Sequence, residues 1–274
     1  MPERKRTVDS DGVSLAVFVD GEGPAVVLLH GLTATHRYVV MGSSALPRAG
    51  FRTVSYDARG HGASSPARSY SYRALAGDLR AVLDALEVER AVLAGASMGA
   101  HTLLRFALEA PERVAGLVVI TPAFLPGAVD DPARAQRWHD LAEGLRSGGV
   151  EGFMEAYGEP NVPESMRATV LDAVRQRLGR HEHPEAVADA LDELPFSRPF
   201  ESLDELAPIA APTTVVASRD EADPEHPYDV GAAYADAIPR ARLVSEDPGR
   251  SPLAWQGGQL SRVIAAVAES AAPA

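Results

Sequence analysis

The sequence predicts an α/β fold in which a mostly parallel sheet is flanked by helices, and three observations carry this prediction. Short apolar runs alternate with longer amphipathic segments along most of the chain. A G-x-S-x-G turn, Gly95 to Gly99, stands between an apolar run and a helical stretch. A proline-rich segment with little strand character interrupts the alternation from about Thr121 to Pro208. Near-continuous apolar strands separated by helices are typical of a parallel sheet covered on both faces.

The part of the chain before the interruption predicts alternating strands and helices. Apolar runs predict strands at 25–29, 90–94 and 114–120, and a further strand is expected at 52–56. One helix is expected over about 72–86, because five apolar residues recur there at helical spacing: Leu75, Leu79, Val82, Leu83 and Leu86. A second helix, over about 100–110, is expected directly after the G-x-S-x-G turn.

The interrupting segment predicts a helical lid over the sheet. Helical patterns occur within it at 132–146, 150–157, 163–179 and 184–193. The sheet pattern then resumes, with strands expected at 212–217 and 241–244 and helices at 230–237 and 253–268. We therefore expect a core formed by residues 1–122 and 209–274, with a lid formed by residues 123–208 and inserted after the sixth strand.

Composition limits the classes of function. The 274 residues carry a net charge of −12, which argues against a nucleic-acid partner because such a partner needs a basic face. There is no cysteine, which excludes disulfides, thiolate zinc sites and a cysteine nucleophile. The charged start, Met1 to Arg6, is not followed by an apolar signal segment, and no run is long enough to span a bilayer. We expect a cytoplasmic protein without a membrane partner.

Three motifs follow one another on the predicted elements. They are Leu28-Leu29-His30-Gly31-Leu32, then Asp57-Ala58-Arg59-Gly60-His61-Gly62-Ala63-Ser64, and then Gly95-Ala96-Ser97-Met98-Gly99. In this order and spacing the chain resembles the α/β-hydrolase fold family over nearly its whole length. A resemblance at this level is strong evidence for the fold and weaker evidence for the reaction, because the fold supports many chemistries.

The resemblance assigns roles to residues around the turn. It implies that Ser97 is the nucleophile, placed on a nucleophile elbow between a strand and a helix. It also implies an oxyanion hole formed by the backbone N–H groups of Leu32 and Met98, which would stabilise a developing oxyanion. His30 is expected to pack and hydrogen-bond beneath the site.

The acidic partner is expected in the loop after strand 212–217, because the family order after the serine is acid and then histidine. Two aspartates in this loop fit. Asp220 has the usual offset from the strand, and Asp223 begins a D-x-x-H-P sequence that ends at Pro227. We favour Asp223 and keep Asp220 as the alternative.

The usual base is missing from the sequence. The family carries a histidine after the last strand, but no histidine follows His226 in this chain. The corresponding position is Arg250 or Ser251, and neither side chain can accept the proton, since a guanidinium stays protonated and a hydroxyl is no base. The chain either supplies a displaced base or does not use a conventional acyl-serine path.

Other histidines of the chain are candidates for the base or for lining the pocket. His226 lies in the acid loop, His36 follows the oxyanion loop, and His139 stands beside Trp138 on a lid helix. His101 is expected in helix packing, and His181 and His183 on the lid surface.

The expected substrate is a small, largely hydrophobic molecule with a carbonyl group. The first hypothesis is a hydrolase that acts on an ester, lactone, thioester or amide, or on a C–C bond beside a carbonyl, through Ser97. A lyase, cyclase or isomerase that uses the oxyanion hole without acylation is one alternative. A degenerate ligand-binding protein is another. An epoxide hydrolase or dehalogenase is disfavoured, because proteins of those kinds resemble this fold with an aspartate at the elbow.

No cofactor is expected. The histidine spacing does not match a metal site of the H-x-x-E-H kind. The expected partner is the small-molecule substrate, and a homodimer is left open.

Overall fold

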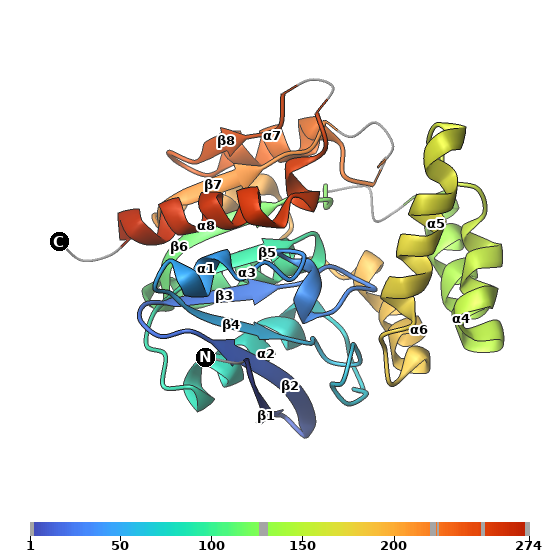
Figure 1. Cartoon of the computed structure of the whole chain (residues 1–274), viewed down its shortest axis with the longest axis horizontal. Coiled ribbons are helices and arrows are strands. Elements are labelled where there is room, and N and C mark those ends of the chain that lie inside the picture. The colour runs from blue at the N-terminus through green and yellow to red at the C-terminus, as the bar shows by residue number, and fades with distance from the viewer. Residues whose placement is uncertain (1–2, 126–130, 220–222, 224, 248–249, 272–274) are drawn as a thin grey trace.

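The computed structural model describes residues 3–125, 131–219, 223, 225–247 and 250–271. One eight-stranded sheet crosses the molecule in the order β1-β2-β4-β3-β5-β6-β7-β8 (Figure 1). Its strands are β1 (Arg4–Ser10), β2 (Val13–Asp20), β3 (Ala25–Leu29), β4 (Arg52–Tyr56), β5 (Ala91–Ala96), β6 (Val114–Ile120), β7 (Thr213–Val216) and β8 (Arg242–Val244). From β4 to β8 all neighbours pair in parallel, whereas β2 pairs antiparallel with both β1 and β4. The predicted fold class is confirmed.

Helices cover both faces of the sheet and complete two apolar layers. They are α1 (Ala45–Arg48), α2 (Tyr72–Ala85), α3 (Met98–Glu109), α7 (Tyr228–Ala237) and α8 (Gly257–Ala271). One face packs against α2, α3 and α7 through residues such as Leu79, Phe106 and Tyr234. The opposite face packs against α1 and α8 through residues such as Leu46 and Ile264.

A helical insert follows β6 and stands beyond the carboxyl ends of the parallel strands (Figure 1). It contains α4 (Pro132–Tyr157), α5 (Glu164–Leu178) and α6 (Pro184–Glu193). The three helices share an apolar core of their own that includes Leu145, Phe153 and Leu191. Gly149 interrupts α4 with φ 61° and ψ −146°, so that α4 consists of two helical parts, at the place where the sequence predicts a break.

Short 3₁₀ turns connect several of these elements. They are η1 (His36–Tyr38), η2 (Pro111–Arg113), η4 (Leu194–Phe196), η5 (Leu203–Leu206) and η6 (Leu253–Trp255). The last of them corrects the sequence prediction, because the final helix begins at Gly257 and not at residue 253.

The N-terminal hairpin is the main element that the sequence prediction lacks. β1 lies at the edge of the sheet and exposes most of its side chains, so it carries no apolar run. β2 buries Val13, Leu15, Val17 and Val19, which share one face at the period of two that a strand imposes, and Ala16 is buried on the other face. The Asp11-Gly12 turn between them has positive φ at both residues, 53° and 78°, as expected for a tight hairpin turn.

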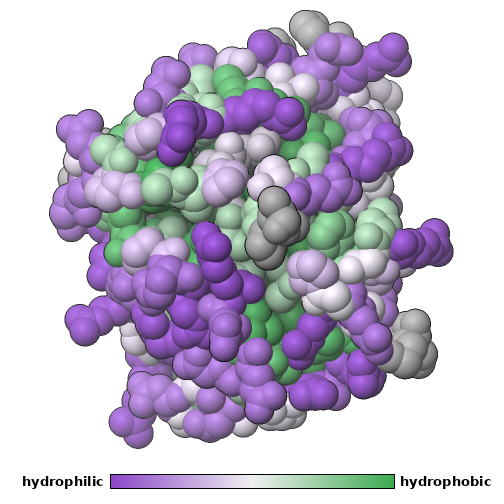
Figure 2. All heavy atoms as spheres, turned by 90° about the vertical axis from the view of Figure 1, so that its left-hand side faces the viewer, coloured by the Kyte–Doolittle hydropathy of each residue, from purple (hydrophilic) through white to green (hydrophobic). Residues whose placement is uncertain are grey.

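The face that points away from the insert is largely hydrophilic, with apolar patches between the charged side chains (Figure 2). Within the described ranges, no helix combines the length and the apolar character that crossing a bilayer requires.

A buried ion pair ties the turn after β4 to α2. Arg59 donates from Nε and Nη2 to the two carboxylate oxygens of Asp78, each over 2.7 Å, and from Nη1 to the carbonyl of Ser69 over 2.9 Å. The Asp78 side chain is fully buried. Burial acts to lower the pKa of Arg59, but the hydrogen bonds and charge of Asp78 outweigh it and raise the pKa.

Asp78→Asn is expected to lower the free energy of unfolding by about 3–5 kcal/mol, because it leaves the Arg59 charge buried without its counterion. Urea denaturation followed by circular dichroism measures the loss. Asp84→Asn is the matched control on α2: this side chain is 56% exposed and pairs with Arg113, so its loss is expected to cost under about 1 kcal/mol. Equal losses in the two variants would contradict the importance of the buried pair.

Candidate active site

Ser97 occupies a strained turn between β5 and α3. Its backbone has φ 51° and ψ −112°, a conformation that a non-glycine residue adopts only when the surroundings impose it. The flanking glycines make the turn possible. A Cβ on Gly99 would lie 2.2 Å from the Leu29 carbonyl oxygen, and one on Gly95 would lie 2.4 Å from the carbonyl carbon of Gly99. Both positions therefore require glycine, and the serine is held at the carboxyl end of β5.

Three side chains meet at this turn. His226 Nε2 lies 2.9 Å from Ser97 Oγ, and His226 Nδ1 lies 2.8 Å from Asp223 Oδ2. These two distances are within hydrogen-bond range, and the ring stands between the hydroxyl and the carboxylate. The side chains of His226 and Asp223 are 20% and 28% exposed, so both are partly accessible to solvent.

One turn carries both the aspartate and the histidine. They lie in the loop between β7 and α7, and the backbone N–H of His226 donates to the carbonyl of Asp223 over 3.3 Å. Burial acts to raise the pKa of the Asp223 carboxyl, but the hydrogen bond and charge of His226 outweigh it, and the pKa is lowered. The carboxylate is therefore held ionised beside the ring. Asp220, the alternative acid, lies outside the described residues.

Glu246 lies just after β8, on the loop where the family resemblance implies a histidine. Its carboxylate is buried and accepts the backbone N–H groups of Arg219 and Leu253, the latter over 2.9 Å. Because Arg219 lies three residues after the end of β7, this contact braces the start of the loop that leads to Asp223 and His226. Arg250 and Ser251 are exposed.

The loop after β3 lies against the serine turn. A Cβ on Gly31 would meet Ser97 Cβ at 3.5 Å and the Ala96 carbonyl oxygen at 3.4 Å, so the two backbones are close neighbours here. Met98 is the first residue of α3, where a backbone N–H has no acceptor within the helix. Leu32 packs against the core of the insert. The two predicted oxyanion donors thus come from segments that adjoin Ser97.

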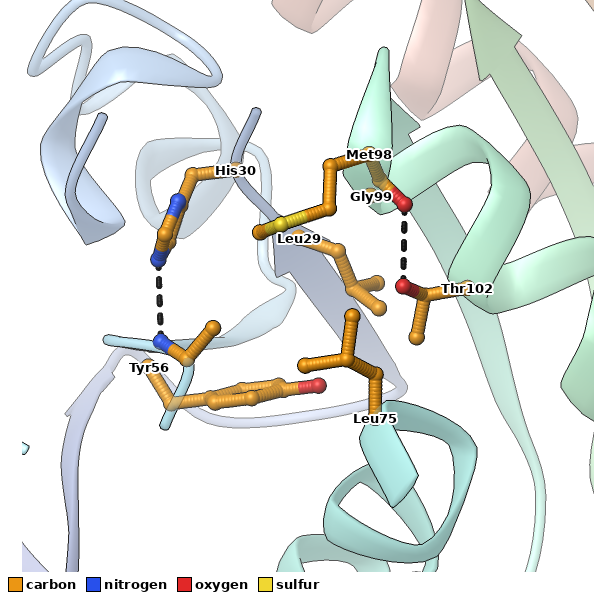
Figure 3. A pocket seen from close by; sticks show the side chains of 8 residues that line it. Leu29, His30, Tyr56, Leu75, Met98, Gly99 and Thr102 are labelled. Carbon is orange, nitrogen blue, oxygen red and sulfur yellow. Dashed lines mark hydrogen bonds between the residues drawn. The ribbon is translucent and has the colours of Figure 1, made fainter. Parts of the chain in front are cut away.

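His30 is buried beneath the turn. It accepts the backbone N–H of Ala58 at Nε2 over 2.9 Å (Figure 3). Its Nδ1 donates to the Gly31 carbonyl over 2.8 Å. Burial lowers its pKa to about 4. It lines a cavity of about 10 Å³ together with Leu29, Tyr56, Ala58, Leu75, Met98, Gly99 and Thr102. Since that volume admits no more than one water, the cavity is not the substrate site.

Two of the other candidate histidines contact groups other than Ser97. His36 Nδ1 bonds Asp57 Oδ1 over 2.8 Å, and its ring stacks on Phe18 with centroids 3.6 Å apart. His139 is 60% exposed and faces Asp192 at 3.3 Å, because α4 turns it outward rather than toward the sheet. Trp138 packs against the insert's core.

His101 and His181 hold backbone segments together. His101 is buried in helix packing as expected, and its Nε2 accepts the backbone N–H groups of Ala123 and Phe124, each over 3.1 Å. The prediction of a surface position for His181 is wrong. Its Nδ1 accepts the N–H of Gly62 over 2.8 Å and its Nε2 donates to the Thr33 carbonyl over 2.9 Å, so this residue fastens the insert to the core.

Sequence reasoning misses two further charged residues, Glu246 and Arg177. Glu246 could have been suspected from its place after the last strand. Arg177 on α5 has no distinguishing pattern, because it is one of several arginines on that helix. Within the described ranges, no three His, Asp or Glu side chains gather closely enough to hold a metal ion.

Comparisons with known proteins agree with this architecture. Residues 24–255 match the family model described as alpha/beta hydrolase fold. A 2-hydroxy-6-oxononadienedioate/2-hydroxy-6-oxononatrienedioate hydrolase from Burkholderia vietnamiensis is 32% identical over 86% of this chain and 84% of its own length. An esterase from Thermogutta terrifontis, solved with malate bound, superposes with a TM-score of 0.81 at 24% identity, over 98% of this chain and 99% of that one.

A further relative matches over a shorter stretch. Epoxide hydrolase 3 from Siraitia grosvenorii is 36% identical over 56% of this chain, and the match spans 44% of that protein. The chain thus matches less than half the length of this relative. The extent of the family match, together with the sheet order and the serine turn, shows that the chain belongs to the α/β-hydrolase fold family.

Proposed function

We propose that the protein is a serine hydrolase that acts on a small carbonyl substrate, with His226 as a base displaced from its usual loop. The observation that carries this proposal is the 2.9 Å contact between Ser97 Oγ and His226 Nε2. A serine hydroxyl is a weak nucleophile until an adjacent base takes its proton, and a neutral ring nitrogen at this distance can do so.

The reaction follows from the three contacts. Ser97 Oγ attacks the carbonyl carbon while its proton passes to His226 Nε2. Asp223 accepts the Nδ1–H of the ring and stabilises the imidazolium that forms. The backbone N–H groups of Met98 and Leu32 stabilise the oxyanion of the tetrahedral intermediate. Collapse of the intermediate, with His226 returning the proton to the leaving group, gives an acyl-serine that water then hydrolyses.

Displacement of the base preserves the order of roles along the chain. Serine, acid and histidine still follow one another, but acid and base share one turn instead of two loops. Glu246 then has a bracing role on the β8 loop, consistent with its backbone contacts.

The substrate class rests on the chemistry of the site and on the relatives. A hydrolase of an oxo-dienedioate and an esterase support a substrate in which a carbonyl carbon is attacked. The relatives that are epoxide hydrolases extend the choice to epoxide opening. We favour acyl transfer, because the elbow residue is the hydroxyl of Ser97, which His226 is placed to deprotonate.

An organophosphorus serine probe such as a fluorophosphonate is expected to add once to the native protein, at Ser97. Intact-mass measurement detects the adduct, and peptide mapping locates it. Ser97→Ala is expected to remain unlabelled, and His226→Ala to label far more slowly because the hydroxyl keeps its proton. The absence of an adduct on native wild-type protein would argue for one of the non-acylating alternatives.

A further inference from the structure

Arg177 lies near the end of α5, on the part of the insert that approaches the catalytic loops. Its neighbours Val174 and Leu178 are buried in the insert's core. Directly after it, Arg180 Nε donates to the Tyr38 hydroxyl over 3.2 Å, and His181 bonds the Thr33 carbonyl. These contacts hold the end of α5 against the loop that follows β3, which carries the predicted oxyanion donor Leu32.

Val174 and Leu178, which precede and follow Arg177 on α5, pack in the same apolar core as Leu32, so this part of α5 lies beside the predicted oxyanion loop. The Asp223 carboxylate and the hydroxyls of Tyr38 and Tyr157 are the groups whose fields act on its guanidinium. In turn, Arg177 is among the charges that lower the pKa of Asp223. Asp223 Oδ2 is hydrogen-bonded to His226 Nδ1, and no ion pair within 4 Å joins Asp223 to Arg177, both of which the structure describes.

Arg177 has no counterion among the residues that the structure describes. Its Nε is buried and meets no acceptor there, whereas Arg175 on the same helix pairs with Glu151 over 3.2 Å. Burial lowers the pKa of Arg177, the sign that its charge is poorly solvated. Arg177 is half-buried, and a cation that is partly shielded from water without a partner is costly, so its presence at this end of α5 calls for an anion that arrives from outside.

We propose that Arg177 is the carboxylate-binding residue of the site and that the natural substrate is acidic, with a free carboxylate on the acyl side of the scissile carbonyl. A guanidinium offers parallel N–H donors that match the two oxygens of a carboxylate. This inference rests on the proposed hydrolase function. It narrows the substrate class to esters, lactones or ketones that carry an anionic group.

A bound substrate would also contact both parts of the molecule, the insert and the core. Arg177 belongs to the insert, whereas Ser97 and His226 belong to the core. A substrate that reaches from the serine to the guanidinium would therefore be positioned from both sides, and a neutral substrate would lack the second contact.

Two esters test the proposal: the mono-4-nitrophenyl ester of adipate, which carries a carboxylate, and 4-nitrophenyl hexanoate, which has the same chain length without it. The wild type is expected to favour the acidic ester in kcat/KM. Arg177→Met is expected to lower kcat/KM for the acidic ester by about 100-fold, while the neutral ester is hydrolysed as before. Arg177→Lys should restore part of the loss, and Arg175→Met, which removes an exposed cation of the same helix, should change neither ester.

A parallel loss on both esters would overturn the proposal, because it would mean that Arg177 acts through Asp223 or through folding. A wild type that does not favour the acidic ester would overturn it as well. A ligand-binding measurement distinguishes failure of the proposed carboxylate site from failure of the proposed hydrolysis. In Ser97→Ala, which cannot acylate, adipate but not adipamide is expected to raise the melting temperature, and Arg177→Met is expected to abolish the rise. No rise with adipate would contradict the carboxylate site whether or not the enzyme hydrolyses esters.

Discussion

His226→Ala is expected to lower kcat for ester hydrolysis by roughly 10⁶-fold, the loss found when the base of a serine-protease triad is removed. The reason is that Ser97 Oγ would keep its proton, since His226 Nε2 is the group within 2.9 Å that can accept it. Steady-state hydrolysis of 4-nitrophenyl hexanoate by the wild type and the variant measures the loss.

A second histidine provides the control. His183 lies on the insert at the start of α6 and faces Glu185 at 3.6 Å, so His183→Ala is expected to retain wild-type turnover. Circular dichroism of both variants checks that the fold is kept. If His226→Ala retained turnover close to that of the wild type, the base would have to be another group, and the proposed proton path would be wrong.

The free energy of unfolding is expected to fall steeply as the pH is lowered from about 7 to about 5, by about 2 kcal/mol for His30 and about the same for His101. Burial lowers the pKa of His30 to about 4 and that of His101 to about 3. It also lowers the pKa of His61 and of His181. Denaturant titrations at several pH values measure the change.

The sign follows from proton uptake. In the unfolded chain these histidines bind protons below about pH 6.5, but in the folded protein they stay neutral to far lower pH. The unfolded state therefore binds more protons across this window, and stability is lost as the pH falls. Asp57 does not contribute here. Burial acts to raise its pKa, but the bond to His36 and nearby histidines lower it to about 2, so its contribution is lost only at still lower pH.

His181→Asn provides a direct check on the pH dependence. An amide can accept the Gly62 N–H and donate to the Thr33 carbonyl but does not titrate, so the variant is expected to show a shallower loss of stability with acid. His183→Asn, at a residue that makes no such contacts within the described structure, should leave the slope unchanged. A stability that stays constant or rises toward pH 5 would contradict the prediction.

Local sequence patterns predict the sheet and the insert, because burial in the fold determines which positions of a strand or helix are apolar. The strands β3, β5 and β6 are apolar runs, since helices cover both of their faces, and the helix after Ser97 follows from the G-x-S-x-G turn. The edge strand β1 is not predicted in this way, because its seven residues have mostly exposed side chains and resemble a polar segment. The buried position of His181 is not predicted either, because its ring bonds Gly62 and Thr33, which lie more than a hundred positions away in the sequence.

The sequence by itself determined the α/β-hydrolase fold, the elbow at Ser97 and the absence of a histidine after the last strand, because each is a matter of residue type and short-range order. The tertiary structure alone decided which groups face one another. His226 reaches Ser97 across 129 positions of sequence, Glu246 braces the loop that carries it, and Arg177 is left near Asp223 without a counterion among the described residues. These contacts depend on how the loop after β7, the loop after β8 and the insert come together at one end of the sheet. Because these segments are far apart in the sequence, no local sequence pattern predicts their contacts.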